Sequence, residues 1–206
     1  MIQPIIMCKA PIEGQVKTRL TSAYTPRQAT EIHAAMATIV IDRCARLLPG
    51  TWIAADDVRH PFFLDFGLRV VGQGEGDLGQ RMSRLLTQAC VEGAAGALFL
   101  GVDSPHMSEA RIRQAMRELD RADVVIGPVE DGGYDLIALG GCHTSMFERI
   151  EWGGARVCEQ SLAAADGAGL AVRLLNVGFD VDHPDDVKRA ADAGWSAGSR
   201  FVQTHE

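Results

Sequence analysis

Charged residues gather in three short stretches of this sequence. The first, residues 9–20, reads KAPIEGQVKTRL and places Lys9, Lys17 and Arg19 around a turn that contains Gly14. Cationic side chains and free loop amides together can bind a phosphate group. The stretch lacks the GxxxxGK[ST] spacing of a Walker A loop. On composition alone, a solvated loop with surface charges is an equally good interpretation.

The second stretch is Asp103-Ser104-Pro105, directly after the apolar residues 97–102. A carboxylate at the end of a buried strand can hold a hard cation such as Mg²⁺ or Mn²⁺, while phosphate oxygens and water complete the coordination. The alternative is an aspartate that only hydrogen-bonds the turn at Ser104 and Pro105. Taken alone, the stretch slightly favours this alternative.

The third stretch, residues 180–186, reads DVDHPDD. In an extended chain Asp180 and Asp182 point the same way, so they could supply a second metal contact or a base. Asp182 or His183 could instead cap a helix that begins at Pro184. The later aspartates suit the positive end of that helix's dipole better than they suit a ligand site.

Two further polar positions have a strong local interpretation. Residues 131–134, DGGY, contain dipeptides that are ordinary in turns, although glycine also lets a ligand approach the backbone closely. Asp77 stands three residues before Gln80, which is the spacing of a capping box. We therefore interpret Asp77 first as a helix N-cap and leave both interpretations of the DGGY stretch open.

Strands and helices alternate along the chain around these residues. Thr25, Pro26 and Gln28 have the order of an N-cap, a first-turn proline and a capping box, which predicts a helix to about Leu48. The alternation predicts an α/β fold with a mainly parallel sheet and helices on both faces. Ligands bind such sheets beyond the carboxyl ends of the strands, where all three charged stretches fall. We predict strands over residues 2–8, 51–55, 68–71, 97–102, 124–127, 134–139 and 171–175, and further helices from about residues 78, 108, 155 and 184.

The composition is that of a globular protein. The chain has 206 residues, of which 47% are hydrophobic and 23% charged, and this suits one domain. We expect that domain to span residues 1–194 and a C-terminal tail to cover residues 195–206. The formal net charge of −7 disfavours nucleic acid as a partner, because proteins that bind a phosphate backbone usually carry a basic face.

The cellular location is also indicated by the sequence. No apolar run approaches the roughly 20 residues that span a bilayer, and the first residues lack the basic region of a signal peptide. The five cysteines have no CxxC spacing, which favours reduced thiols over disulfides or a zinc knuckle. We expect a cytoplasmic protein that binds no membrane. Nothing in the sequence indicates an oligomeric state.

Together the stretches match a known set of motifs in collinear order, over about residues 2–190. They are KAPxxGxxKTRL, GDLGxRM, DSP, GPxxDGGYxL and DVDxPxD, beginning at residues 9, 76, 103, 127 and 180. In this order they resemble a bacterial glycosyltransferase-like family of the nucleotide-diphospho-sugar transferase superfamily. They are also similar to the phospholactate and molybdenum-cofactor guanylyltransferases. The resemblance implies a single-domain GT-A-type, Rossmann-like fold.

The resemblance also implies an activity. It is metal-dependent transfer from a nucleotide-activated donor to a small-molecule acceptor, with Mg²⁺ or Mn²⁺ as cofactor. Glycosyl transfer from a nucleotide sugar is favoured. Nucleotidyl transfer from a nucleoside triphosphate, which releases pyrophosphate, is the alternative, and a nucleotide-binding domain without catalysis is the third possibility.

Individual residues follow from the motifs. Where related proteins often have WST, this chain has Trp152-Gly153-Gly154, and the loss of two hydroxyl groups bears on the identity of the acceptor. The resemblance implies catalytic roles for Lys17, Arg19 and Asp103, nucleotide or phosphate binding by Lys9, Gly14, Lys17, Arg19 and Asp77, metal binding by Asp103 and Asp182, and a substrate pocket at Asp131, Gly132, Gly133, Tyr134 and Trp152.

Overall fold

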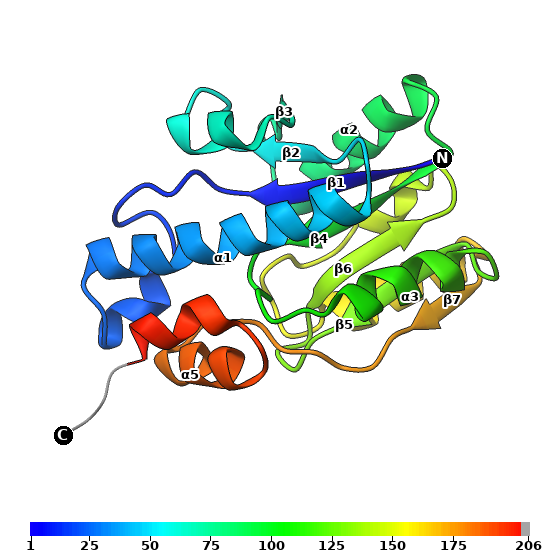
Figure 1. The fold of residues 1–206 in the computed structure, drawn as a ribbon. Coiled ribbons are helices and arrows are strands. Elements are labelled where there is room, and N and C mark those ends of the chain that lie inside the picture. The colour runs from blue at the N-terminus through cyan, green and yellow to red at the C-terminus, as the bar shows by residue number, and fades with distance from the viewer. Residues whose placement is uncertain (203–206) are drawn as a thin grey trace.

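The computed structural model describes residues 1–202, and its strands form one seven-stranded sheet (Figure 1). The strands are β1 (Ile2–Cys8), β2 (Trp52–Ala55), β3 (Arg69–Gly72), β4 (Gly96–Gly101), β5 (Val124–Pro128), β6 (Tyr134–Leu139) and β7 (Val172–Leu174). Their order across the sheet is β3-β2-β1-β4-β6-β5-β7. The predicted α/β fold with one mainly parallel sheet is confirmed.

Strand β6 runs antiparallel to both of its neighbours, β4 and β5. The pairs β1–β2, β1–β4, β2–β3 and β5–β7 are parallel. The reversal brings the amino end of β6, with Tyr134 and Asp135, to the edge of the sheet where β1 and β4 end. The start of β6 therefore meets the ends of β1 and β4 at this carboxyl edge.

The helices begin where the capping signals predict them. Thr25 and Gln28 form the expected capping box, with Pro26 as the first helical residue. Asp77 and Gln80 form the second box, and Ser108 caps the next helix through its side chain. The α-helices are α1 (Pro26–Leu47), α2 (Leu78–Val91), α3 (Glu109–Leu119), α4 (Val157–Gly167) and α5 (Pro184–Asp192), and the 3₁₀ helices are η1 (Thr18–Ser22), η2 (Pro61–Phe66), η3 (Thr144–Phe147) and η4 (Ser196–Phe201).

The central strands are buried on both faces, which explains why they read as nearly continuous apolar runs. In β1, Ile6 packs on the face covered by α1 and α3, whereas Ile5 packs on the face covered by α2, η3 and α4. Burial of each such side chain stabilises the fold by roughly 1.5–3 kcal/mol. The helices thus form a layer on each side of the sheet, as predicted.

A third apolar cluster lies beyond the carboxyl edge, between α1, η1, α5 and η4. Residues 195–201 show no clear pattern in the sequence and belong to the predicted tail. Instead Trp195 is 1% exposed and Phe201 packs against its ring, because the cluster offers an apolar surface for both. The rest of the expected tail, residues 203–206, lies outside the described residues.

Within residues 1–202 no helix has both the length and the apolar character needed to cross a membrane. All five cysteines are free thiols.

Candidate functional site

A cleft of about 660 Å³ opens at the carboxyl edge of the sheet. Its size lies in the roughly 300–1,000 Å³ range of small-molecule sites. It is lined by the ends of β1 and β4, the start of β6, the loop that leads into η1, the first turn of α2 and the segment before α5. Each of the three charged stretches contributes to it.

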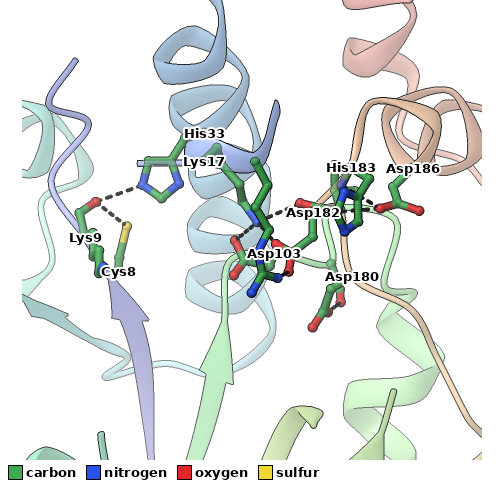
Figure 2. A network of polar contacts seen from close by, with 12 residues as sticks. Cys8, Lys9, Lys17, His33, Asp103, Asp180, Asp182, His183 and Asp186 are labelled. Atoms are coloured by element: carbon green, nitrogen blue, oxygen red, sulfur yellow. Dashed lines mark hydrogen bonds and ion pairs between the residues drawn. The ribbon is translucent and has the colours of Figure 1, made fainter. Parts of the chain in front are cut away.

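Lys17 joins the three stretches in the cleft (Figure 2). Its Nζ atom lies 2.8 Å from Oδ1 of Asp103 and 2.9 Å from Oδ1 of Asp182. It also donates a hydrogen bond of 2.6 Å to the carbonyl oxygen of Val181. Arg19 contacts the other oxygen of Asp182 at 2.7 Å. We call Lys17, Arg19, Asp103 and Asp182 the Lys17 cluster.

The three acceptors around Lys17 use all the N–H bonds of its ammonium group. The side chain is only 7% exposed. Its backbone has φ 47° and ψ 41°, in the left-handed region, which costs a non-glycine residue of order 1–3 kcal/mol. The ion pairs offset this strain and hold the loop against the cleft.

The charges of the cluster support one another. Burial opposes the charge on Lys17, but Asp103 and Asp182 outweigh it and raise the pKa of the lysine. Burial likewise opposes ionisation of Asp182, but Lys17 and Arg19 outweigh it and lower the pKa of that carboxyl. The lysine and the Asp182 carboxylate are therefore both charged at neutral pH.

The end of β4 is tied to the segment before α5. The Val181 amide donates to the carbonyl oxygen of Asp103 at 2.9 Å. Ser104 Oγ lies 2.6 Å from Oδ1 of Asp180 and 3.0 Å from the carbonyl oxygen of Phe179. Burial raises the pKa of Asp180 to about 7, and the nearby Asp103 carboxylate adds to the effect. These contacts fix the two carboxylate stretches relative to each other.

The carboxylates of the Lys17 cluster are oxygen ligands of the kind that a divalent cation needs. Asp103 and Asp182 converge on one nitrogen atom, so their oxygens could reach one cation. Among residues 1–202, no group of three or more His, Cys, Asp or Glu side chains is arranged to hold a metal. Mg²⁺ is often held by only one or two carboxylates together with substrate phosphates. The residues therefore fit a cation that binds together with a phosphorylated ligand.

Most of the residues predicted to bind nucleotide line the cleft. Lys9, Lys17, Arg19 and Asp77 all contribute to its surface. Gly14 instead lies at the exposed tip of the loop, with φ 76°, and is outside the lining. Its contribution is the left-handed turn, which glycine adopts without strain.

Asp77 has two roles, because it lines the cleft and also caps the N-terminus of α2. Its Oδ1 accepts a hydrogen bond of 2.8 Å from the Gln80 amide. Two residues later, Gly79 has no room for a side chain, because a Cβ atom there would lie 2.5 Å from Nε1 of Trp152. The GDLG motif thus lets Trp152 pack against the first turn of α2.

The residues expected to border a substrate pocket separate into two groups. Asp131, Gly132 and Gly133 are not among the described residues that line the cleft. They form a turn in which Asp131 Oδ1 accepts from the Gly133 amide at 2.8 Å. Gly132 has φ 88°, and a Cβ atom there would lie 1.9 Å from the carbonyl oxygen of Ala155. Gly132 therefore serves close packing against the Ala155 backbone.

The second group consists of Tyr134 and Trp152, whose rings pack edge to face with centroids 6.3 Å apart. Tyr134 lines the cleft, but its hydroxyl is buried, and this burial raises the pKa of the phenol. Trp152 does not line the cleft, but the next residue, Gly153, does. Tyr134 thus offers a ring surface to the cleft, and its hydroxyl is turned inward.

Gln73 and Asp135 are among the further residues that line the cleft without belonging to any predicted site. Gln73 is buried and donates to the carbonyl oxygen of Ala54 at 2.8 Å. Its position after a predicted strand was the available signal. Asp135 lies within a predicted buried strand, where an ionisable residue is rare unless it is paired. The rarity of unpaired ionisable residues in buried strands would have predicted a charged partner for Asp135.

One protein family matches more than half of the chain. Residues 28–154 match the bacterial family described as "Uncharacterized protein conserved in bacteria (DUF2064)". The chain belongs to this family. The matched residues include Asp77, Asp103 and Tyr134, and they exclude Lys17 and Asp182. No curated protein sequence matches the chain.

Solved structures give a broader likeness. A "putative nucleotide-diphospho-sugar transferase" from Desulfovibrio desulfuricans G20 is 26% identical, with a TM-score of 0.86 over 98% of this chain and 95% of that chain. A CMP:2-keto-3-deoxy-manno-octonic acid synthetase complexed with CTP is 12% identical, with a TM-score of 0.58 over 97% and 99% of the two chains. Rv0371C of Mycobacterium tuberculosis H37Rv, complexed with manganese, is 18% identical, with a TM-score of 0.56 over 93% and 99%. The last two show a shared fold, and the predicted resemblance to the nucleotide-diphospho-sugar transferase superfamily is confirmed.

Proposed function

We propose that the chain is a metal-dependent glycosyltransferase that uses a nucleotide sugar as its donor. The observation that carries the proposal is the Lys17 cluster, in which two cations and two carboxylates meet in a cleft of about 660 Å³. The likeness to the Desulfovibrio protein supports the donor class. The free cysteines support a cytoplasmic location.

In this proposal the cluster binds the diphosphate of the donor. Asp103 and Asp182 would hold Mg²⁺ or Mn²⁺, and that cation would supply positive charge that neutralises the diphosphate and stabilises the leaving group. The manganese complex of a protein with the same fold supports this cofactor. Arg19 and Lys17 add positive charge beside the leaving phosphate. Lys9 and Asp77 both contact the nucleotide.

Lys17 has to change partners when such a ligand binds. All its N–H bonds are used by Asp103, Asp182 and the Val181 carbonyl group. A phosphate oxygen can accept from Lys17 only if one of these acceptors is given up. Asp103 and Asp182 would then need another positive charge beside them, which a divalent cation would supply. We therefore propose that the nucleotide and the cation bind together.

The acceptor would enter beside Tyr134 and Gly153, which line the cleft. Its hydroxyl group would attack the anomeric carbon and lose its proton to water, the bond from that carbon to the diphosphate oxygen would break, and a nucleoside diphosphate would leave. Asp131, Gly132 and Gly133 would shape this side as a turn behind Tyr134. Trp152 would hold the ring of Tyr134 in place.

Nucleotidyl transfer is the second candidate, and the CTP complex of a synthetase with the same fold favours it. Here a phosphorylated acceptor would attack the α-phosphorus of a nucleoside triphosphate, and pyrophosphate would leave. The same cluster could stabilise that charge, because both reactions release a phosphorylated leaving group. The leaving group therefore distinguishes the two candidates.

The test is a thermal-shift and calorimetric screen of nucleotide sugars and nucleoside triphosphates, each with Mn²⁺, Mg²⁺ or EDTA. A ligand that binds only the folded state raises the midpoint of unfolding. We expect a metal-dependent shift with a nucleotide sugar and, with the acceptor present, release of nucleoside diphosphate. A shift with triphosphates and release of pyrophosphate would favour the second candidate. Binding without turnover over a broad acceptor panel would favour a nucleotide-binding domain without catalysis.

A further inference from the structure

Arg111 and Asp135 form a buried ion pair at the cleft, apart from the Lys17 cluster. Arg111 belongs to α3 and Asp135 to β6, and their side chains are 15% and 3% exposed. Two nitrogens of the guanidinium group contact the two carboxylate oxygens, at 2.9 and 3.0 Å. Paired contacts of this kind fix the orientation of both groups. Burial raises the pKa of Asp135 to about 6, although Arg111 opposes the shift.

The same guanidinium group reaches the backbone of two other segments. Nη1 of Arg111 donates to the carbonyl oxygen of Asn176 at 2.6 Å, and Nη2 donates to that of Pro128 at 3.4 Å. The Pro128 carbonyl group also accepts from the Gly178 amide at 2.8 Å. Arg111 thus connects α3, β6 and the end of β5 with the start of segment 176–182, which carries Asp180 and Asp182.

Two glycines make room for the ion pair. A Cβ atom at Gly127 would lie 2.4 Å from Oδ1 of Asp135, and one at Gly178 would lie 3.0 Å from its Oδ2. Both backbones therefore pack directly on the charged groups. Further along segment 176–182, Ser104 contacts Asp180 and Lys17 contacts Asp182.

We propose that Arg111 is a positioning residue that fixes segment 176–182 so that Asp182 meets Lys17 and Asp103. Arg111 acts through the carbonyl groups of Asn176 and Pro128 and through Asp135. These contacts lie at the start of the segment, whereas Asp182 lies at its end. The catalytic meaning of this placement rests on the proposed function. The placement itself can be tested without any nucleotide.

The test uses the reactivity of Lys17. The chain has three lysines, and Lys9 and Lys188 are exposed internal references for the buried Lys17. Brief acetylation with acetic anhydride, followed by mass spectrometry, gives the labelling rate of Lys17 relative to the other two. In Arg111→Gln we expect this relative rate to rise at least about tenfold, because release of a buried hydrogen-bonded charge opens its surroundings locally. Arg111→Lys should restore part of the protection.

Two further variants separate positioning from general loss of stability. Leu86→Ala removes a buried side chain of α2 and should lower the unfolding midpoint while the relative rate of Lys17 stays unchanged. Arg111→Met combined with Asp135→Leu removes both charges without leaving one buried and unpaired, and should still expose Lys17. An unchanged Lys17 rate in this folded double variant overturns the proposal, even if nucleotides bind. A raised rate supports it, even if the nucleotide screen fails.

Discussion

The Lys17 cluster and the turn at residues 131–133 lie near the same edge of the sheet, but their polar groups find partners at different distances along the chain. Lys17 bonds Asp182 across 165 positions of sequence. Asp131 bonds the Gly133 amide two positions away. Within the described residues, the cluster lines the cleft and the turn does not.

This difference separates side chains that form a site from side chains that shape the backbone. A buried charge that is satisfied only by distant partners requires the whole fold to hold it. The turn aspartate finds its partner within its own loop, and the left-handed φ of Gly132 suits a glycine there, with the Ala155 carbonyl group packed closely against it. We therefore expect substitutions in the cluster to change ligand binding and substitutions in the turn to change stability.

The largest contrast is expected between Asp103→Asn and Asp131→Asn. Loss of the Asp103 charge should weaken metal-dependent nucleotide binding by at least about 100-fold, beyond the 10–100-fold typical of an outer partner of a metal ligand. Asp131→Asn keeps an oxygen for the Gly133 amide and should leave the affinity nearly unchanged. Calorimetry with Mn²⁺ and the donor found in the screen measures both. Equal losses in the two variants would contradict the distinction between the regions.

The second contrast concerns glycines. Gly132→Ala should lower the free energy of unfolding by about 2–4 kcal/mol, since it adds strain at φ 88° to a clash with the Ala155 carbonyl group. Gly93 has φ 96° and open space around it. Gly93→Ala is therefore a control with strain alone, and its cost should be clearly smaller. Urea denaturation measures both values, and equal costs would show that the contact with Ala155 is unimportant.

The fold could be predicted from the sequence because its signals are local. The capping boxes at Thr25 and Asp77 and the apolar runs of the strands place most elements within a few residues. The charged residues at strand ends were predicted to meet because parallel strands end at one edge. The antiparallel direction of β6, and with it the position of Asp135, depends on strand pairing. No local signal carries that information.

The difference between local and long-range signals also explains why the partners of Lys17 could not be predicted. Lysine after a glycine turn indicates phosphate binding, and the sequence motif implied that role. Saturation of its ammonium group by Asp103, Asp182 and Val181 depends on three distant segments. It therefore became visible only in the folded chain.

The saturation of Lys17 by carboxylates has a consequence for metal binding. Without the ammonium group of Lys17, Asp103 and Asp182 would lose the cation that neutralises them. Lys17→Gln should therefore bind Mn²⁺ alone about tenfold more tightly than the unaltered chain, a gain of roughly 1.4 kcal/mol, while its affinity for the nucleotide falls. Titration with Mn²⁺ in the absence of nucleotide checks this. If the affinity for Mn²⁺ alone stays the same, Lys17 and the cation do not compete.

The smallest effect is expected where the two regions are joined. Between them, Phe179 is stacked against the His106 ring and the Arg189 guanidinium group, each 3.8 Å from its ring centroid. Arg189 also forms a paired contact with Glu130, next to the turn. His106 thus lies at a junction whose groups include several cations.

The pH dependence of this junction follows from the pKa of His106. Burial lowers it to about 4, and Arg189, Arg43 and Arg111 add to the effect. The folded pKa lies below the unfolded value, so the stabilisation is complete above about pH 6.5 and is lost as the pH falls towards 4. His106→Phe keeps the stacking but cannot accept a proton. Between pH 7 and pH 5 the unaltered chain should lose about 1 kcal/mol more than this variant, a value reduced for the partial exposure of the ring. Urea denaturation at both pH values measures the difference, and parallel losses would mean that His106 takes up a proton as readily in the folded state as in the unfolded state.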